Sequence, residues 1–121
     1  MDVNAARSCT LGIDLGTTAI KVAAFSSDTN DELLSLVSRP ANLRRAADGA
    51  AELDPHEQYS ALLDALAEVV DVIHSRGYSV ARIGISSAMH SLLGVTEDGA
   101  PLTPVMTWAD LRAQADAQAL W

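Results

Sequence analysis

Residues 11–18 read Leu-Gly-Ile-Asp-Leu-Gly-Thr-Thr, and the rest of the fold is arranged around this stretch. An apolar run with strand character, residues 9–13, leads to Asp14 and a tight Gly-Thr-Thr turn, and a second such run, residues 19–25, follows at once. Two strand-like runs joined by so short a turn predict a β-hairpin. Gly16 in the turn has no Cβ, so the backbone there can approach a ligand closely.

The turn has the chemistry of a phosphate-binding loop. Its N–H groups can converge on an anion, and the hydroxyls of Thr17 and Thr18 add donors. A carboxylate at Asp14 would repel a phosphate unless a cation lay between them, so Asp14 is expected to bind Mg²⁺ directly or through water. The alternative is a plain hairpin with a solvated Asp14. A Walker A loop is excluded, because the Gly-Lys-Ser/Thr ending and the helix after it are both missing.

Length and composition restrict the class of protein. The chain has 121 residues, 49% of them apolar, which suits one modest core and therefore one domain or part of one. Its net charge of −8 argues against nucleic acid or an anionic membrane as a partner. No apolar run approaches the ~20 residues of a membrane span. The single cysteine, Cys9, is expected to be a buried, reduced thiol, which fits a cytoplasmic protein.

The first half of the chain divides into a leader, strands and a loop. Residues 1–8 are expected to be a disordered leader. Three strands are predicted at residues 9–14, 18–26 and 33–37, and their short connections favour an antiparallel meander. Residues 39–48, with the basic pair Arg44-Arg45, are expected to form a solvated loop.

The clearest helix start in the chain lies at Asp54. Asp54 is the expected N-cap, Pro55 the first helical residue and Glu57 the reciprocal partner of a capping box, while Gly77 is expected to end the helix. The helix carries one continuous apolar stripe at helical spacing: Tyr59, Leu62, Leu63, Leu66, Val69, Val70 and Ile73.

Residues 80–86 predict a fourth strand that is apolar on both faces, which is typical of a covered interior strand. Because it follows a helix, it is expected to run parallel to an earlier strand, and the order β-β-β-α-β predicts an α/β domain with a mixed sheet. Two further extended runs, residues 91–96 and 103–107, flank a turn with hairpin chemistry. Asp110 is expected to cap a last helix. Since that helix reaches Trp121 without a stop signal, the sequence is expected to be a fragment of a longer chain.

A second group of candidate residues follows the fourth strand. In open α/β sheets, ligands collect beyond the carboxyl ends of parallel strands. Met89 offers an adaptable apolar surface there, and His90 can exchange hydrogen bonds with a polyol. The alternative is that Met89 fills the core and His90 only ends the strand. A zinc site is disfavoured, because no second ligand stands at the required spacing.

Trp108, Asp110 and Arg112 complete this group. A Trp face can stack on the C–H surface of a sugar, and the two charged side chains can bind hydroxyls or a carboxylate. The alternative is a core Trp followed by an ordinary N-cap.

Together these motifs resemble the N-terminal domain of the FGGY carbohydrate kinases, which have the ribonuclease-H-like fold of the actin, Hsp70 and hexokinase class. The resemblance covers nearly all of residues 9–121. It rests on residues 12–18 with Lys21, on the Glu-Leu-Asp-Pro of residues 52–55, and on Ala88-Met89-His90. Residues 89–92, 101–104 and 107–110 with Arg112 look most like the gluconate branch, with the xylulose branch next. One departure is Leu111, where the gluconate branch usually carries Asn.

The resemblance implies ATP-dependent phosphorylation of a sugar or sugar acid, gluconate first and xylulose as the alternative. Asp14 would organise Mg²⁺, and Gly16, Thr17, Thr18 and Lys21 would face the ATP phosphates. The sugar pocket would be lined by Met89, His90, Trp108, Asp110 and Arg112. The family's general base, an Asp, would lie beyond Trp121 in an absent second domain. The chain alone is therefore expected to lack activity. Because a partly apolar surface that the missing residues would normally cover would be exposed, self-association, for instance as a homodimer, is also expected.

Two other classes remain open at this point. One is a nucleotide-binding module of the actin or Hsp70 type, which would need no sugar-binding wall. The other is a non-catalytic remnant that folds without performing any chemistry.

Overall fold

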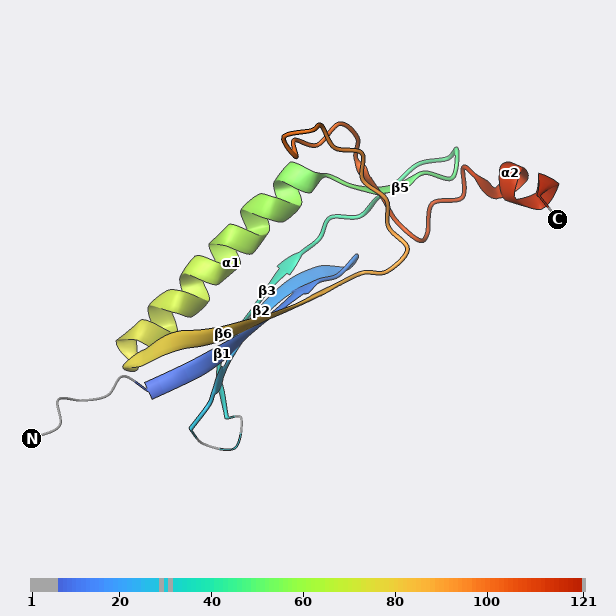
Figure 1. Cartoon of the computed structure of the whole chain (residues 1–121). Coiled ribbons are helices and arrows are strands. Elements are labelled where there is room, and N and C mark those ends of the chain that lie inside the picture. The colour runs from blue at the N-terminus through green and yellow to red at the C-terminus, as the bar shows by residue number, and fades with distance from the viewer. Residues whose placement is uncertain (1–6, 29, 31, 121) are drawn as a thin grey trace, which may run out of the picture.

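The fold is built on a four-stranded sheet in the order β3-β2-β1-β6 (Figure 1). The computed structural model describes residues 7–28, 30 and 32–120. Strands β1 (Arg7–Leu15), β2 (Ala19–Ser26) and β3 (Leu33–Pro40) form the predicted antiparallel meander. Strand β6 (Tyr78–Ser87) runs parallel to β1, as expected of a strand entered from a helix. The α/β class with a mixed sheet is confirmed.

The sheet begins earlier in the chain than the sequence predicted. Strand β1 starts at Arg7, so residues 7 and 8 belong to it and not to a leader. Two contacts place Arg7: its N–H donates to the Gly77 carbonyl, and its guanidinium lies over the ring of Tyr78 at 4.2 Å from the centroid. The rest of the expected leader, residues 1–6, lies outside the described residues.

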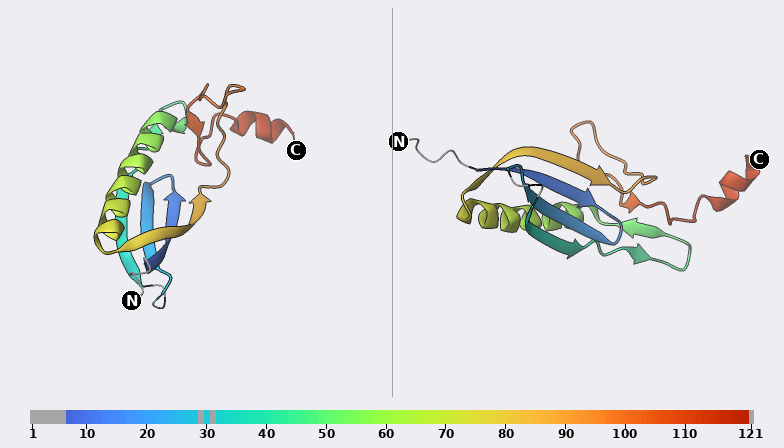
Figure 2. Two further views of the ribbon diagram at one scale, coloured as in Figure 1. Left: turned by 60° about the vertical axis from the view of Figure 1, so that its left-hand side comes forward. Right: turned by 90° about the horizontal axis from the view of Figure 1, so that it is seen from below.

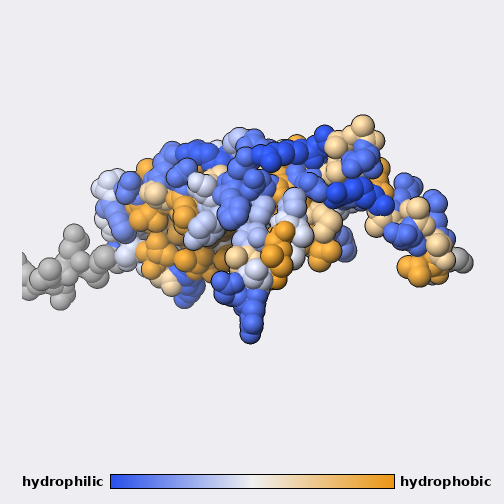
Figure 3. All heavy atoms as spheres, turned by 90° about the horizontal axis from the view of Figure 1, so that it is seen from above, coloured by the Kyte–Doolittle hydropathy of each residue, from blue (hydrophilic) through white to orange (hydrophobic). Residues whose placement is uncertain are grey.

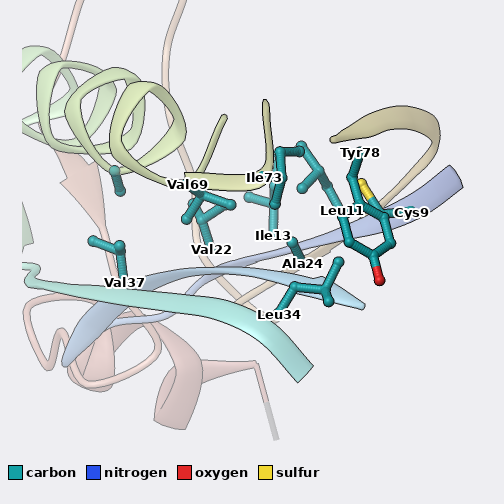
Figure 4. Packing of buried hydrophobic residues seen from close by; sticks show 11 residues of the cluster. Cys9, Leu11, Ile13, Val22, Ala24, Leu34, Val37, Val69, Ile73 and Tyr78 are labelled. Carbon is teal, nitrogen blue, oxygen red and sulfur yellow. The ribbon is translucent and has the colours of Figure 1, made fainter. Parts of the chain in front are cut away.

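One helix, α1 (Pro55–Ser75), covers one face of the sheet (Figures 1 and 2). Alternation along β1 turns Cys9, Leu11 and Ile13 towards the helix and the residues between them to the opposite face. Figure 4 shows the resulting cluster, in which Val69 and Ile73 of α1 pack over the sheet. Each fully buried side chain of this size contributes about 1.5–3 kcal/mol. Cys9 is completely buried, as expected.

The ends of α1 follow the sequence signals. The Asp54 carboxylate accepts hydrogen bonds from the backbone N–H groups of His56 at 2.8 Å and Glu57 at 3.3 Å. Gly77 lies just past the end of the helix at φ 78°, a left-handed conformation that favours glycine. Glu57 was predicted to be the reciprocal partner of Asp54 in a capping box. Its carboxylate instead forms an ion pair with Arg44.

Two expectations about buried faces were wrong. Tyr59 and Leu63 are exposed, because the buried stripe of α1 runs instead through Ala65, Val69 and Ile73. Strand β6 is an edge strand whose only partner among the described residues is β1, and its residues 81–87 are exposed. The physical reason is that α1 packs mainly over β2 and β3, so β6 is buried only at Tyr78.

The sheet face opposite α1 is open (Figure 2). It contains a hollow of about 580 Å³ lined by side chains of β1, β2, β3 and β6, with Asp14 and Lys21 among them. None of the helices in residues 7–28, 30 and 32–120 is long and apolar enough to cross a membrane. Figure 3 shows apolar patches interspersed with hydrophilic surface on the face that it displays.

A second, small sheet lies beyond the loop ends of the main one. It comprises β4 (Arg44–Arg45), β5 (Ala51–Leu53) and β7 (Val105–Met106), all antiparallel. The basic pair predicted to lie in a solvated loop therefore forms a short, exposed strand. Arg44 also lies 3.8 Å from the Asp54 carboxylate. Because β5 directly precedes the N-cap of α1, this sheet fixes where the helix begins.

The segment after β6 is only partly as predicted. Leu92 pairs with Met106 and Val95 with Pro101, so the two extended runs do face each other across a turn. The predicted start of the last helix was wrong. Helix α2 (Gln114–Ala119) has Ala113, and not Asp110, at its N-cap position, and no side chain caps it. Asp110 lies before it and binds other groups, described below. Trp121 lies outside the described residues.

Candidate functional site

The turn between β1 and β2 lies at the carboxyl end of β1, where it was expected. Gly16 N–H donates to the Ala19 carbonyl at 3.1 Å and closes the turn. A Cβ on Gly16 would stand 2.8 Å from that same carbonyl oxygen, closer than side chains tolerate. Glycine is thus required by the tightness of the turn itself. The hydroxyls of Thr17 and Thr18 make no hydrogen bond to another described residue, which leaves them free to face a ligand.

Asp14 and Lys21 are cross-strand neighbours beside this turn. Asp14 lies opposite Lys21 on β2 and opposite Ser86 on β6. Asp14 is half-buried and Lys21 is exposed, and no ion pair between them is present. The carboxylate therefore remains free for a cation, and the ammonium group for an anion.

The donor set near Asp14 fits one particular kind of metal site. In the described part of the chain, no three His, Cys, Asp or Glu side chains gather closely enough to hold a metal ion. A nucleotide-bound Mg²⁺ needs only one or two carboxylates, because waters and phosphate oxygens complete its shell. A single free carboxylate beside free hydroxyls is compatible with that arrangement and incompatible with a closed protein metal site.

The loop that follows β6 is tied to the turn that follows β1. Ala88 N–H donates to the Leu15 carbonyl at 3.0 Å, so the residues after both parallel strands meet at one edge of the sheet. Met89 is 74% exposed, and the next residue, His90, is exposed at φ 58°. A left-handed conformation is uncommon for a residue with a Cβ and is concentrated at functional sites. Neither side chain is buried in the core of the chain, so the alternative in which Met89 fills the core is wrong.

Trp108 is presented to solvent by a braced loop. Its side chain is 62% exposed, while Thr107 before it is buried. Thr107 donates to the Ala51 carbonyl from both its backbone N–H, at 3.0 Å, and its hydroxyl, at 2.8 Å. The loop is therefore anchored on β5, and Trp108 is not the core residue of the alternative interpretation.

Asp110 and Arg112 are bound to each other and to β5. Asp110 accepts hydrogen bonds from Arg112 Nε at 3.0 Å and from the backbone N–H of Ala51 at 3.1 Å. The Arg112 guanidinium beside Asp110, together with the Ala51 N–H, holds the pKa of this carboxyl well below its ordinary value. Arg112 also reaches Glu52 at 2.5 Å. These charged groups brace the Trp108 loop.

Two residues of this region were missed by the sequence interpretation. Glu52 was noted only as part of a motif, although it anchors Arg112. Gln58 lies one turn before Leu62, on the buried side of α1, and a polar residue at that place in the stripe was the signal that could have identified it. The stripe was instead started at Tyr59, which is 64% exposed.

Comparisons with known proteins show the family to which the chain belongs. The sequence model for the FGGY family of carbohydrate kinases, N-terminal domain, matches residues 9–121. The gluconokinase of Bacillus subtilis is 36% identical over 104 residues, which cover 86% of this chain and 20% of that protein. A xylulose kinase of Staphylococcus epidermidis is 34% identical over 102 residues, 84% of this chain and 20% of that protein.

Solved structures show the same likeness. The gluconate kinase from Lactobacillus acidophilus superposes with a TM-score of 0.82 at 30% identity, covering 93% of this chain and 22% of that one. The chain thus spans about a fifth of the length of the relatives it matches.

Proposed function

The chain belongs to the FGGY family of carbohydrate kinases, and we propose that it supplies the phosphate-binding turn and one wall of the sugar site of an ATP-dependent sugar or sugar-acid kinase. The observation that carries the proposal is the bond from Ala88 N–H to the Leu15 carbonyl. Through this bond, the candidate phosphate turn and the loop of Met89 and His90 share one edge of the sheet.

The roles of the individual residues follow from the chemistry of phosphoryl transfer. In this reaction the protein mainly positions the reacting groups and neutralises charge, so the site needs donors for the phosphate oxygens and must hold the acceptor hydroxyl in place. The turn N–H groups, the two threonine hydroxyls and Lys21 supply donors. Asp14 would hold Mg²⁺, which offsets the charge on the phosphates. A base for the sugar hydroxyl is expected from residues outside this chain.

The side chains of Met89, His90 and Trp108 are all exposed, and each is of a type that suits a polyol. An aromatic face and a thioether can pack on C–H groups, while an imidazole exchanges hydrogen bonds with hydroxyls. An actin-type or Hsp70-type nucleotide module would have no use for such a group. This is the reason for preferring a sugar kinase over a module that binds only a nucleotide.

Gluconate is the first substrate candidate. The support is the run from Met89 to Leu92 and the Thr-Trp-Ala-Asp of residues 107–110, which resemble the gluconate branch. Xylulose is the second, because relatives named xylulose kinase match almost as well as those named gluconokinase. Phosphorylation of gluconate would yield 6-phosphogluconate.

The test uses a chimaeric kinase in which residues 9–121 replace the matching region of the Bacillus subtilis gluconokinase. ADP release is measured with gluconate, xylulose, ribulose and glycerol, and mass spectrometry identifies the product. We expect gluconate to give the highest kcat/KM. If no sugar stimulates ADP release while the parent enzyme remains active under the same conditions, the proposed function is refuted.

The role of His90 is tested in the same chimaeric kinase. His90→Ala is expected to abolish most sugar phosphorylation and to leave the affinity for ATP nearly unchanged, because His90 lies on the sugar side of the site. His74→Ala, at an exposed position near the end of α1, is the matched control. A parallel loss of ATP affinity would show that His90 supports the whole site and not the sugar.

A further inference from the structure

The side-chain amide of Gln58 contains an unpaired buried donor. Its Nε2 atom is buried and has no hydrogen-bond partner, the single such side-chain atom within the part of the chain that the structure describes. A buried donor without a partner is costly, and folded proteins keep few of them. Leucine or methionine would continue the apolar stripe of α1 at this position at no such cost. The amide of Gln58 is therefore available to pair with a polar group that enters the space beside it.

Gln58 lines a cavity of about 250 Å³ at the loop end of the sheet. The hydroxyl-bearing residues Ser87 and Ser91 contribute to this cavity, and its remaining wall is largely aliphatic, with Leu15, Leu53 and Val105. Pockets for whole small molecules are usually about 300–1,000 Å³, so this one suits part of a ligand. Hydroxyl-bearing residues beside an aliphatic wall match a carbon chain that carries hydroxyl groups.

The cavity lies between the two halves of the candidate site. Leu15 immediately precedes the phosphate turn, and Ser87 and Ser91 flank Met89 and His90. A sugar that contacts the exposed side chains of this loop can thus extend one end towards Gln58. The position is adjacent to the proposed chemistry and is not a remote surface hollow.

We propose that this cavity is a subsite for a hydroxyl group of the acceptor sugar, and that Gln58 is its specificity-determining donor. This inference rests on the proposed function and deepens it. A hydroxyl fits better than a carboxylate, because the cavity is lined by no lysine, arginine or histidine and charge buried without a partner is costly. A hydroxyl can also accept from the amide N–H₂ or donate to the amide oxygen, so it satisfies either orientation of the side chain. The carboxylate of a sugar acid would then lie outside this cavity.

The subsite is tested by NMR on the ¹⁵N-labelled chain. The side-chain amide signals of Gln58 are assigned by their absence in Gln58→Met, and those of Gln114, an exposed residue of α2, by Gln114→Met. The chain is titrated with gluconate, with glucitol as an uncharged polyol of the same length, and with hexanoate as an acid without hydroxyls. We expect gluconate and glucitol to shift the Gln58 signals with saturation, hexanoate to leave them in place, and the Gln114 signals to stay constant throughout.

The variants give the quantitative part of the test. Gln58→Met should weaken gluconate binding by roughly tenfold or more, the factor that corresponds to one lost hydrogen bond to a polar ligand, whereas Gln114→Met should bind as the unchanged chain does. In the chimaeric kinase, Gln58→Met should raise the KM for sugar by a similar factor and leave the KM for ATP unchanged.

Three results would overturn the inference. The first is a shift of the backbone signals of residues 89, 90 and 108 without any shift at Gln58, which would leave the proposed function standing and remove the subsite. The second is an equal response to hexanoate. The third is a Gln58 amide that contacts only water and is unaffected by either polyol. The proposed function itself is judged separately, by sugar-dependent ADP release.

Discussion

Substitution of Gly16 by alanine tests why the turn between β1 and β2 has its sequence. An alanine Cβ would stand 2.8 Å from the Ala19 carbonyl oxygen, which belongs to the backbone and cannot rotate away. The turn must then open, and the bond from Gly16 N–H to that carbonyl, 3.1 Å long, is weakened or lost. Stability should fall, and the direction does not depend on any ligand.

The magnitude follows from two contributions. A hydrogen bond is worth about 0.5–1.5 kcal/mol net, and forcing an extra carbon into a filled space costs about 1–3 kcal/mol. Since the backbone relaxes partly, we expect Gly16→Ala to lower the free energy of unfolding by about 2 kcal/mol. That is a large share of the roughly 5–15 kcal/mol that stabilise a typical domain.

The assay is urea unfolding of the chain, followed by circular dichroism at neutral pH. Gly84→Ala is the matched control, because a Cβ on Gly84 of β6 meets nothing within 4 Å. We expect its midpoint to equal or slightly exceed that of the unchanged chain, since alanine is less flexible than glycine when unfolded. Equal midpoints for Gly16→Ala and Gly84→Ala would refute the reasoning about this turn.

Two further predictions concern the chain alone. Asp54→Ala removes the acceptor of two N–H groups at the start of α1, so the free energy of unfolding should fall. Ser60→Ala, exposed in the same helix, is the control, and an equal effect of both would contradict the capping role. Asp110→Asn should destabilise the chain most above about pH 4, the ordinary aspartate pKa. Arg112 lowers the pKa of Asp110 in the folded chain, so this carboxylate contributes stability above its unfolded pKa and loses it as the pH falls through the folded value. Urea midpoints measured across the acid range should therefore converge for the two proteins at low pH, and a constant gap would count against this ion pair.

Most of the main sheet was predictable from the sequence, because local signals determine it. Short turns force neighbouring strands to run antiparallel, and a helix between two strands permits a parallel return, so β1, β2, β3 and β6 were placed correctly. Asp54, Pro55 and Gly77 act on the backbone within one helical turn and gave the ends of α1.

The errors arose where distant contacts decide the outcome. The apolar pattern of β6 predicted cover on both faces, but burial depends on where α1 packs, and α1 lies mainly over β2 and β3. Asp110 has the chemistry of an N-cap, yet Ala51, which is 59 residues away, competes for its carboxylate together with Arg112. The small sheet of β4, β5 and β7 brings residues from three separate segments together and has no local signal.

The candidate site shows the same division. The roles of residues 14–18 and 88–90 were predicted from their residue types and from their positions at strand ends, and they stay predictions. The bond that joins the two loops, from Ala88 N–H to the Leu15 carbonyl, required the parallel pairing of β1 with β6. The partners of Arg112 and the buried amide of Gln58 required the three-dimensional arrangement.

The central claim is that Asp14 and the turn after it hold the Mg²⁺-bound phosphates of ATP. The most direct measurement is kcat/KM for sugar phosphorylation by the chimaeric kinase carrying Asp14→Ala, with Asp28→Ala, an exposed aspartate at the far end of the same hairpin, as the control. We predict a loss of roughly 100-fold or more for Asp14→Ala, the usual scale when a group that stabilises transition-state charge is removed, and no loss for the control. Full turnover in the Asp14→Ala enzyme would contradict the account.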